Sequence, residues 1–494
     1  MNYFSRLSGS GNKQGIYLLL IIFTAIVLRI FFFNGLVFSD DSYYNKLATT
    51  LLSGDFAKDY IGYPIFLIRK GQALVTALFF FVFGENELTS VAFPFILSLS
   101  SIFLVYKFCE LFFHDKNISI IASFLWAFSP VDIIFASINF TDLQAAFFIN
   151  TGIYFLYKSH KLDKIHYSFF AGILFSISLL FKENLLFVMI LLVLLSTYLL
   201  YKTRKINKHL ALSLIVVFVF VIAEGIIYYL SSGNLDYRFT ILKENYLYCY
   251  YDFFPYTLLG SEYNSTQYTN AVMKQIFILN PKYLFLRRYY LGIPFISLSN
   301  IVLLIKEKRE KLLVFWGIGM IVLLLFMTTS FSDYKPFDLR RSWYIYIALM
   351  PFILLVAQFI SRFNMKIRSV LLIFYSVFSI YMCFEYQKFF NVSEGKALKQ
   401  YVKSLDDSLI YTDLHTKYGL DIIRKNGYKN DTRIILGKFY DLKELPADSY
   451  LIYNKDEVAE LSLQGNIMPD FNVLNEKEFE RVNNFGRFII YRKN

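Results

Sequence analysis

The segment IYLLLIIFTAIVLRIFFFNGLV (residues 16–37), followed directly by FSDDSYY (residues 38–44), decides how the rest of the chain is interpreted. Its first part is apolar over about 20 residues, which is long enough for a helix to cross the hydrocarbon core of a bilayer. The adjacent carboxylates Asp40 and Asp41 therefore fall at a membrane–water boundary. There they can accept a proton or hold a cation. Alternatively, Ser39 or Asp40 simply caps a helix that begins near Ser42.

The composition predicts an α-helical polytopic membrane protein. Of the 494 residues, 56% are hydrophobic and 20% aromatic, and long apolar runs recur from Ile16 to about Phe390. The net charge of +12 does not indicate a nucleic-acid partner, because much of it lies in short loops between apolar runs, where it orients helices. The three cysteines are too few and too scattered for a disulfide framework or a metal cluster.

We expect about eleven spans, with the amino end inside and the carboxyl end outside. After Ile16–Val37, the predicted spans are Leu88–Lys107, Ile118–Phe135, Leu143–Tyr157, Tyr167–Phe181, Leu185–Leu200, Leu210–Leu230, Leu286–Ile305, Leu312–Ser330, Trp343–Ile360 and Val370–Phe389. The apolar run Gln72–Phe83 is short for a span, and leaving it out places the amino end and the basic loops on one side, as the positive-inside rule requires. The first outer loop would then carry juxtamembrane helices, one of which, Ser42–Ser53, ends at Gly54.

The last hundred residues differ in character. Residues 1–390 form the predicted transmembrane domain, and residues 391–494 form a predicted extracytoplasmic α/β domain. Four short segments of this second domain are typical of strands: Leu409–Thr412, Arg433–Leu436, Tyr450–Tyr453 and Arg487–Tyr491. Helical segments are expected between them, at Thr416–Lys425 and Lys455–Leu463.

With this topology, ionisable side chains from distant parts of the chain meet at the outer face. Asp142 lies at the mouth of a span, where it is also a possible helix cap. Lys182 and Glu183 interrupt an apolar stretch, so they form a tight turn, pair with each other, or face a cavity that binds a lipid phosphate. Arg340 and Arg341 lie on the outer side, against the positive-inside trend, and their guanidinium groups can bind phosphate oxygens. Alternatively, they contact lipid headgroups or pair with Asp338.

Several short motifs, in this order and spacing, are similar to those of a known family. They are Asp40-Asp41-Ser42-Tyr43, Ala48 to Gly54-Asp55-Phe56, Phe83-Gly84-Glu85-Asn86-Glu87, Ser129-Pro130 with Asp142, Gly172 to Lys182-Glu183, and Arg341-Ser342-Trp343-Tyr344 with Pro351. Together they resemble the GT-C glycosyltransferases, in particular the protein O-mannosyltransferase and aminoarabinose-transferase-like branch, over residues 16–390. Two departures are Asp41 in place of the usual Glu, and Arg69-Lys70-Gly71 in place of a His-Pro-Pro or Lys-Pro-Pro element.

The resemblance implies a membrane glycosyltransferase, a hexosyl- or pentosyltransferase, that moves a sugar from a polyprenyl-phosphate-sugar donor to an acceptor hydroxyl with inversion. Asp40 is the expected general base, and Asp41 and Asp142 are the further catalytic candidates. The expected substrate-binding residues are Tyr43, Arg69, Lys182, Glu183, Arg340, Arg341 and Tyr344.

The expected partners are the lipid-linked donor, a lipid, glycan or protein acceptor, and membrane lipids. No cofactor is required, although a divalent cation is possible. The composition, rich in Lys, Asn, Ile and Phe, favours a bacterial inner membrane, with the active site and the C-terminal domain extracytoplasmic. Two alternatives stay open at this point. A transporter or flippase of lipid-linked saccharides would carry charges at mid-membrane, and a glycan polymerase or ligase would share the outer-face residues.

Overall fold

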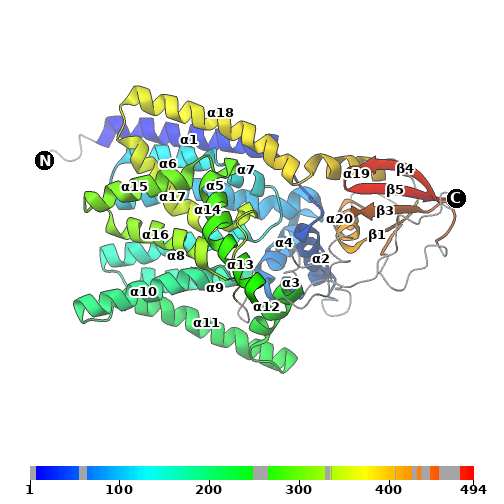
Figure 1. Cartoon of the computed structure of the whole chain (residues 1–494), viewed down its shortest axis with the longest axis horizontal. Coiled ribbons are helices and arrows are strands. Elements are labelled where there is room, and N and C mark those ends of the chain that lie inside the picture. The colour runs from blue at the N-terminus through cyan, green and yellow to red at the C-terminus, as the bar shows by residue number, and fades with distance from the viewer. Residues whose placement is uncertain are drawn as a thin grey trace.

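The computed structural model describes residues 7–54, 64–248, 265–328, 334, 336–405, 408–424, 431–434, 445–455 and 479–494. A bundle of long helices makes up most of the molecule, and a small sheet lies beyond the end of the bundle that is farther from the N-terminus (Figure 1). The bundle helices are α1 (Leu7–Phe31), α5 (Glu87–Phe113), α6 (Lys116–Ala127), α7 (Pro130–Phe135), α8 (Asp142–Leu162), α9 (His166–Phe181), α10 (Leu185–Thr203), α11 (Lys208–Ser232), α15 (Ile293–Lys306), α16 (Lys311–Phe326), α17 (Tyr346–Ser361) and α18 (Met365–Phe389).

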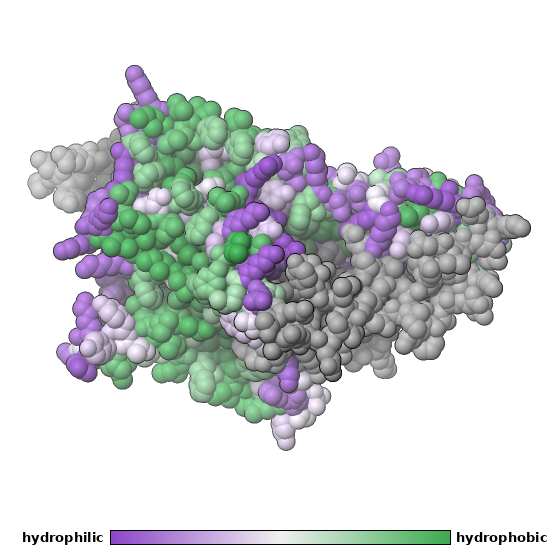
Figure 2. All heavy atoms as spheres, in the orientation of Figure 1, coloured by the Kyte–Doolittle hydropathy of each residue, from purple (hydrophilic) through white to green (hydrophobic). Residues whose placement is uncertain are grey.

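The chain is an integral membrane protein with multiple spans. Within the described residues, six helices are long and apolar enough to cross a membrane, and four shorter helices are apolar. Many large apolar side chains on these helices are exposed, among them Phe23, Phe218 and Phe374. They form a broad hydrophobic band between two hydrophilic ends (Figure 2). The predicted mostly helical membrane fold is therefore confirmed.

Three predicted spans differ in detail from the observed helices. The first helix ends at Phe31 rather than at Val37. The predicted span 118–135 consists of two helices, because α6 ends at Ala127 and Pro130, which lacks an amide proton, starts α7. The predicted span 286–305 is likewise divided, since Leu291 and Gly292 both adopt left-handed backbone conformations before α15 begins.

The helix α4 (Lys70–Phe83) stays at one end of the bundle, as expected for a juxtamembrane helix. At its start, Gly71 packs against Leu180 in the last turn of α9. Three residues beyond Gly84, which ends α4, the carboxylate of Glu87 accepts a hydrogen bond from the Leu36 amide in the segment after α1. Both ends of α4 thus lie at one end of the bundle, where α1 and α9 end and α5 begins. The helix α2 (Asp40–Ser53) packs against α4 and ends, as predicted, at Gly54 in a left-handed conformation.

The predicted basic loops lie together at the opposite end of the bundle. Lys208, at the start of α11, pairs with Asp163 in the α8–α9 turn at 2.8 Å. Lys161 donates to the Leu111 carbonyl of α5 at 2.6 Å. An ion pair between Arg362 in the α17–α18 turn and Glu307 in the α15–α16 turn connects these two turns. Hydrophilic residues gather along this edge of the hydrophobic band (Figure 2).

The C-terminal part contains a five-stranded sheet with the order β2-β1-β3-β5-β4. Its strands are β1 (Leu409–Thr412), β2 (Asp431–Ile434), β3 (Tyr450–Asn454), β4 (Phe479–Phe485) and β5 (Phe488–Lys493). The first three strands pair in parallel, and β5 pairs antiparallel with β3 and β4. β4 was not predicted from the sequence, and most of the predicted helix 455–463 lies outside the described residues. The boundary between residues 390 and 391 stays a prediction.

This sheet shares one hydrophobic core with the first outer loop. Leu36, Phe38 and Phe80 from the loop pack together with Ile410 of β1 and Ile490 of β5. The helix α20 (Leu414–Arg424) packs against α2. It also lies close to the segment before α2, because a Cβ atom at Gly419 would lie 2.5 Å from the Phe38 ring. The C-terminal part therefore holds the segment that carries the acidic pair.

A close helix contact in the bundle gives a test of this packing. A Cβ atom at Gly172 of α9 would lie 2.6 Å from the Val216 side chain of α11. We therefore expect Gly172→Val to destabilise the protein by about 1–3 kcal/mol, because the added atoms overpack the interface. The readout is the thermal unfolding temperature in detergent. Gly15→Val is the matched control, since a Cβ atom there would meet nothing within 4 Å. Equal unfolding temperatures for both variants would contradict this contact.

Candidate functional site

Two buried ion pairs lie side by side where the bundle meets the first outer loop. In the first, Lys182 Nζ donates to both carboxylate oxygens of Asp142, at 2.8 and 2.9 Å. Asp142 is the first residue of α8, where a carboxylate interacts favourably with the helix dipole. Lys182 ends α9, so the pair joins two turns that are 40 residues apart in the sequence.

The second pair joins the first outer loop to the same turn. Arg69, between α3 (Ile65–Ile68) and α4, donates to the two carboxylate oxygens of Glu183 at 2.7 and 3.3 Å. The guanidinium also donates to the Tyr44 hydroxyl of α2 at 3.4 Å. The tyrosine is in turn hydrogen-bonded to Thr141, the residue before Asp142. Residues from three separate stretches of sequence thus meet at one place.

The four charged groups compensate one another. Burial raises the pKa of Glu183, but the nearby charges of Arg69 and Lys182 outweigh this effect and lower the pKa to about 2. The carboxylate is therefore ionised at neutral pH. Lys182 and Glu183 do not pair with each other, because each one has a partner from another segment. Each of the two residues therefore faces a charged partner from another part of the chain.

The two aspartates of the acidic pair have different surroundings. Asp41 is fully buried and accepts hydrogen bonds from the Val37 and Ser39 amides, at 2.8 and 2.7 Å. It fixes the turn between α1 and α2. Asp40 is exposed, and its charge acts on the Tyr44 hydroxyl. Of the two carboxylates, Asp40 is the one that solvent or a substrate can reach.

The late candidates Tyr344 and Arg341 belong to the same cluster. Lys182 Nζ lies 5.5 Å from the centre of the Tyr344 ring, which stacks on Phe337 at 4.7 Å. Arg341, Asp142, Glu183 and Arg69 all act electrostatically on the Tyr344 hydroxyl. Arg341 is half-buried, and its guanidinium lies 5.6 Å from the Trp343 ring.

Two predicted binding residues have other contacts. Arg340 donates to Asp338 at 2.6 Å, which is one of the three interpretations offered for it. Tyr43 is buried, stacks on Phe66 at 4.8 Å and meets the His415 ring edge-on at 4.6 Å. Tyr43 therefore helps to pack α2 against α3 and α20. A substrate contact at these two positions stays a prediction.

Sequence reasoning missed the polar layer beside the ion pairs. Asn139 donates to the Asn45 side chain of α2 at 2.7 Å, and Gln72 of α4 donates to the Asn139 side-chain oxygen. Thr76 lies within hydrogen-bond distance of the same amide. Amide and hydroxyl side chains within apolar stretches could have predicted this layer, because such groups are buried only where they find hydrogen-bond partners.

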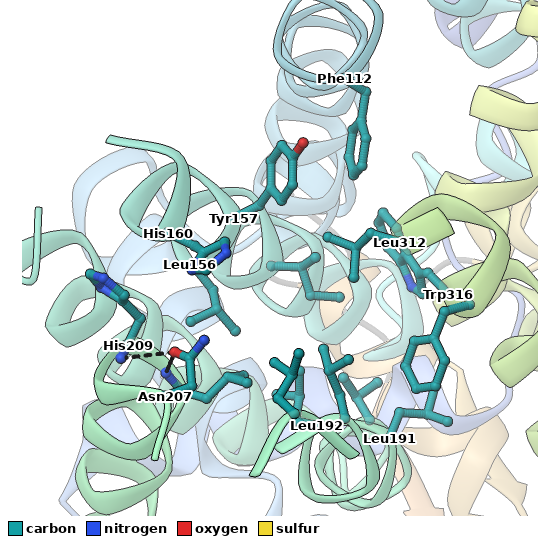
Figure 3. A pocket seen from close by; sticks show the side chains of 16 residues that line it. Phe112, Leu156, Tyr157, His160, Leu191, Leu192, Asn207, His209, Leu312 and Trp316 are labelled. Carbon is teal, nitrogen blue, oxygen red and sulfur yellow. Dashed lines mark hydrogen bonds between the residues drawn. The ribbon is translucent and has the colours of Figure 1, made fainter. Parts of the chain in front are cut away.

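A large apolar cavity of about 350 Å³ lies at the opposite end of the bundle. Figure 3 shows side chains that line it, including Phe112 of α5, Tyr157 of α8, Leu192 of α10 and Trp316 of α16. Its lining includes none of the four ion-pair residues, so we treat it as separate from the candidate site. Among the described residues, no group of three or more His, Cys, Asp or Glu side chains is arranged to hold a metal ion.

Comparisons with known proteins show what the chain resembles. Residues 71–229 match the family described as dolichyl-phosphate-mannose-protein mannosyltransferase. No curated protein matches the sequence. Among solved structures, ArnT from Cupriavidus metallidurans in the apo state superposes with a TM-score of 0.60 at 12% identity, covering 96% of this chain and 97% of that chain. The chain has the GT-C fold.

Two further structures share this fold in complexes with lipid phosphates. ArnT bound to undecaprenyl phosphate gives a TM-score of 0.54 at 11% identity, with 96% of this chain and 97% of that chain covered. The oligosaccharyltransferase AglB from Archaeoglobus fulgidus, with an inhibitory peptide and a dolichol phosphate, gives 0.54 at 12% identity, covering 100% and 75%. The resemblance to GT-C glycosyltransferases is therefore confirmed, and the matched residues 71–229 contain Asp142, Lys182 and Glu183.

A double-mutant cycle tests the coupling at the centre of the cluster. We expect Asp142→Asn and Lys182→Met each to destabilise the protein by about 3–5 kcal/mol, because each leaves a buried charge without its partner. The double variant should lose less than the sum of the two, with a coupling energy of about 1–3 kcal/mol. Thermal unfolding in detergent is the measurement.

The control cycle uses Glu385→Gln and Lys388→Met, an ion pair on α18 whose lysine side chain is 75% exposed. This exposed pair should show no measurable coupling. Strictly additive effects at Asp142 and Lys182 would mean that the two side chains do not form a buried pair.

Proposed function

We propose that the chain is a membrane glycosyltransferase that transfers a sugar from a polyprenyl-phosphate-sugar donor to an acceptor hydroxyl. The observation that supports this proposal is the buried pair of Asp142 and Lys182 at one end of a membrane-embedded bundle, in a chain with a GT-C-like fold. Asp40 and Arg341 act electrostatically on Tyr44 and Tyr344 near this pair. Carboxylates, cations and adjoining apolar surface are the three chemistries that such a donor requires. The lipid phosphates named for ArnT and AglB support the donor class.

The proposed topology has eleven spans, with α6 and α7 together counted as one. The turns that carry Lys161, Lys208 and Arg362 face the cytoplasm under the positive-inside rule. The ion-pair cluster and the C-terminal sheet then face the extracytoplasmic side, in a bacterial inner membrane. A donor in this membrane has its prenyl tail among lipids and its sugar at the outer face, level with the cluster.

Asp40 is the proposed general base. Its carboxylate removes the proton from the acceptor hydroxyl, whose oxygen forms a new bond to the anomeric carbon. The bond between this carbon and the phosphate oxygen breaks, and polyprenyl phosphate leaves. Attack from the face opposite the leaving group inverts the anomeric configuration. A positioned base of this kind contributes roughly 10²–10⁴-fold to the rate.

The cationic groups of the cluster act on the leaving phosphate. Arg341 is half-buried beside Tyr344, and its guanidinium suits phosphate oxygens. Lys182 lies next to the same ring and shares its charge with Asp142. Stabilising the negative charge that develops on the phosphate lowers the barrier to transfer. Asp142, Asp41 and Glu183 have supporting roles, since they hold the cations and the α2 turn in place.

The acceptor is a lipid, glycan or protein hydroxyl that enters from the outer face. Sugar transfer from a phosphate-linked donor is balanced without a redox cofactor, and we propose that no metal is required. A divalent cation near the donor phosphate would act by the same charge stabilisation. The C-terminal sheet, through α20, holds α2 and thereby the position of Asp40.

The test uses a strain that lacks the gene and is complemented with the protein or its variants. We expect mass spectrometry of envelope lipids and glycans to reveal a glycosylated product that the native protein restores. Asp40→Asn should restore less than about 1% of it, as loss of a general base predicts. Asp163→Asn, a carboxylate-to-amide change in the exposed α8–α9 turn, should restore it fully.

Binding of undecaprenyl phosphate to the purified variants separates catalysis from folding. Asp40→Asn should bind this probe as the native protein does. Full product from Asp40→Asn would remove the base assignment. A deletion strain with every envelope glycan unchanged would contradict the proposed function as a whole.

A further inference from the structure

The large apolar cavity of the bundle has no part in the proposed sugar transfer (Figure 3). One of its walls is α10, from Val188 near the start of this helix to Leu199 near its end. At about 1.5 Å per residue, this stretch is about 16 Å long. The other walls come from α5, α8, α11 and α16. The cavity is therefore elongated and separates α10 from the helices across from it.

The cavity reaches the apolar surface of the bundle. Several of its lining side chains are only half-buried, among them Ile153 of α8, Leu195 of α10 and Phe315 of α16. On α10, the neighbouring side chains Val193 and Leu194 are 49% and 56% exposed. Because α10 is long and apolar enough to cross a membrane, these side chains face lipid. The hydrocarbon chains of the membrane are thus within reach of the cavity.

The interior of the cavity suits hydrocarbon better than water. Leu, Ile, Val and Phe side chains make up most of its lining. Apolar cavities of even about 150 Å³ stay dry and take up apolar molecules, and this one has about 350 Å³. Since protein interiors are close-packed, a space of this size beside lipid is expected to be filled.

The polar side chains of the lining gather in one place. His160, Asn207 and His209 lie together on one side of the cavity, whereas the labelled side chains opposite them are Leu312 and Trp316 (Figure 3). The three polar residues belong to the end of α8 and the start of α11, next to the basic turns. An elongated apolar ligand with one polar end would therefore direct that end toward these turns.

Exposed lysines extend two walls of the cavity beyond its polar end. Lys202 lies three residues after Leu199 on α10, and so it shares a face of the helix with this lining residue. Lys311 lies four residues before Phe315 on α16, with the same consequence. Both lysines are exposed. Basic side chains in this position attract anionic lipids.

One hydrogen-bond donor in the wall lacks an acceptor. The Trp316 side chain is buried, and within the part of the chain that the structure describes its indole N–H has no hydrogen-bond partner. The N–H of a buried tryptophan usually finds an acceptor. A carbonyl oxygen of a ligand would satisfy this donor, and a plain hydrocarbon would not.

We propose that this cavity binds one acyl chain of a phospholipid from the leaflet next to the basic turns. The chain extends along α10 toward Val188, an ester oxygen accepts a hydrogen bond from Trp316, and the phosphate lies near Lys202 and Lys311. The lipid fills the space between α10 and the helices across from it, and thereby fixes the position of α10. This inference does not depend on the proposed sugar transfer.

Native mass spectrometry of the purified full chain in neutral detergent tests the site, with phosphatidylglycerol as the probe. Leu195→Trp places a large side chain in the cavity. The matched control is Leu194→Trp, one residue earlier on the exposed face of α10. We expect Leu195→Trp to weaken binding at least about tenfold, because the indole displaces several methylene groups, and burying two of them already contributes about tenfold. Leu194→Trp should bind as the native protein does.

Undecaprenyl phosphate is the comparison probe, and Leu195→Trp should leave its binding unchanged. Unfolding temperatures show whether each variant is folded, and Ile153→Trp, from the α8 wall, serves if Leu195→Trp is not. Unchanged phosphatidylglycerol binding in the cavity variant overturns the proposal. An equal loss in Leu194→Trp also overturns it, since the lipid would then surround the whole bundle. Loss of undecaprenyl phosphate binding, with or without that of phosphatidylglycerol, overturns it as well, because the cavity would then accommodate the prenyl chain.

Discussion

Charge compensation away from water is the constraint on which one end of the bundle depends, the end next to the C-terminal sheet. Asp142 with Lys182, and Arg69 with Glu183, are each nearly buried, and leaving any one of them unpaired would cost several kcal/mol. The partners come from the α3–α4 junction, the start of α8 and the α9–α10 turn. Because the pairs form only when these segments meet, they fix where the first outer loop lies on the bundle.

The same constraint separates groups that maintain the structure from groups that are available for chemistry. Asp41 is occupied by two backbone amides, whereas Asp40, one residue earlier, is exposed beside Tyr44. The α2 helix that carries both is held from the other side by α20 and the sheet, through the core that includes Phe38 and Ile410. In the proposed sugar transfer the base must keep its position relative to the donor phosphate, and this double support would hold Asp40 in place.

Local sequence patterns predicted the elements well where one pattern dominated. The apolar runs predicted the helices of the bundle. The end of α2 at Gly54 and the bounds of β1 were also predicted as observed. Prediction was poorer where local backbone chemistry competed with hydrophobicity, as at Pro130 and at Leu291-Gly292, which divide predicted spans. β4 was missed because Phe479–Phe485 contains Glu, Arg and two Asn residues, and its strand conformation depends on pairing with β5. The convergence of distant charges was predictable from loop sidedness, but their partners were not, because pairing is decided by three-dimensional packing.

In the proposed mechanism, one rim of the bundle holds both the base and the phosphate-binding cations. The most direct measurement is an experimental structure of the protein in a lipid nanodisc with undecaprenyl phosphate bound. We expect phosphate density beside Lys182 and Arg341, in an opening that Asp40 also faces, with the prenyl tail running along the bundle. Phosphate density at the basic-turn end, or an opening that Asp40 does not face, would contradict it.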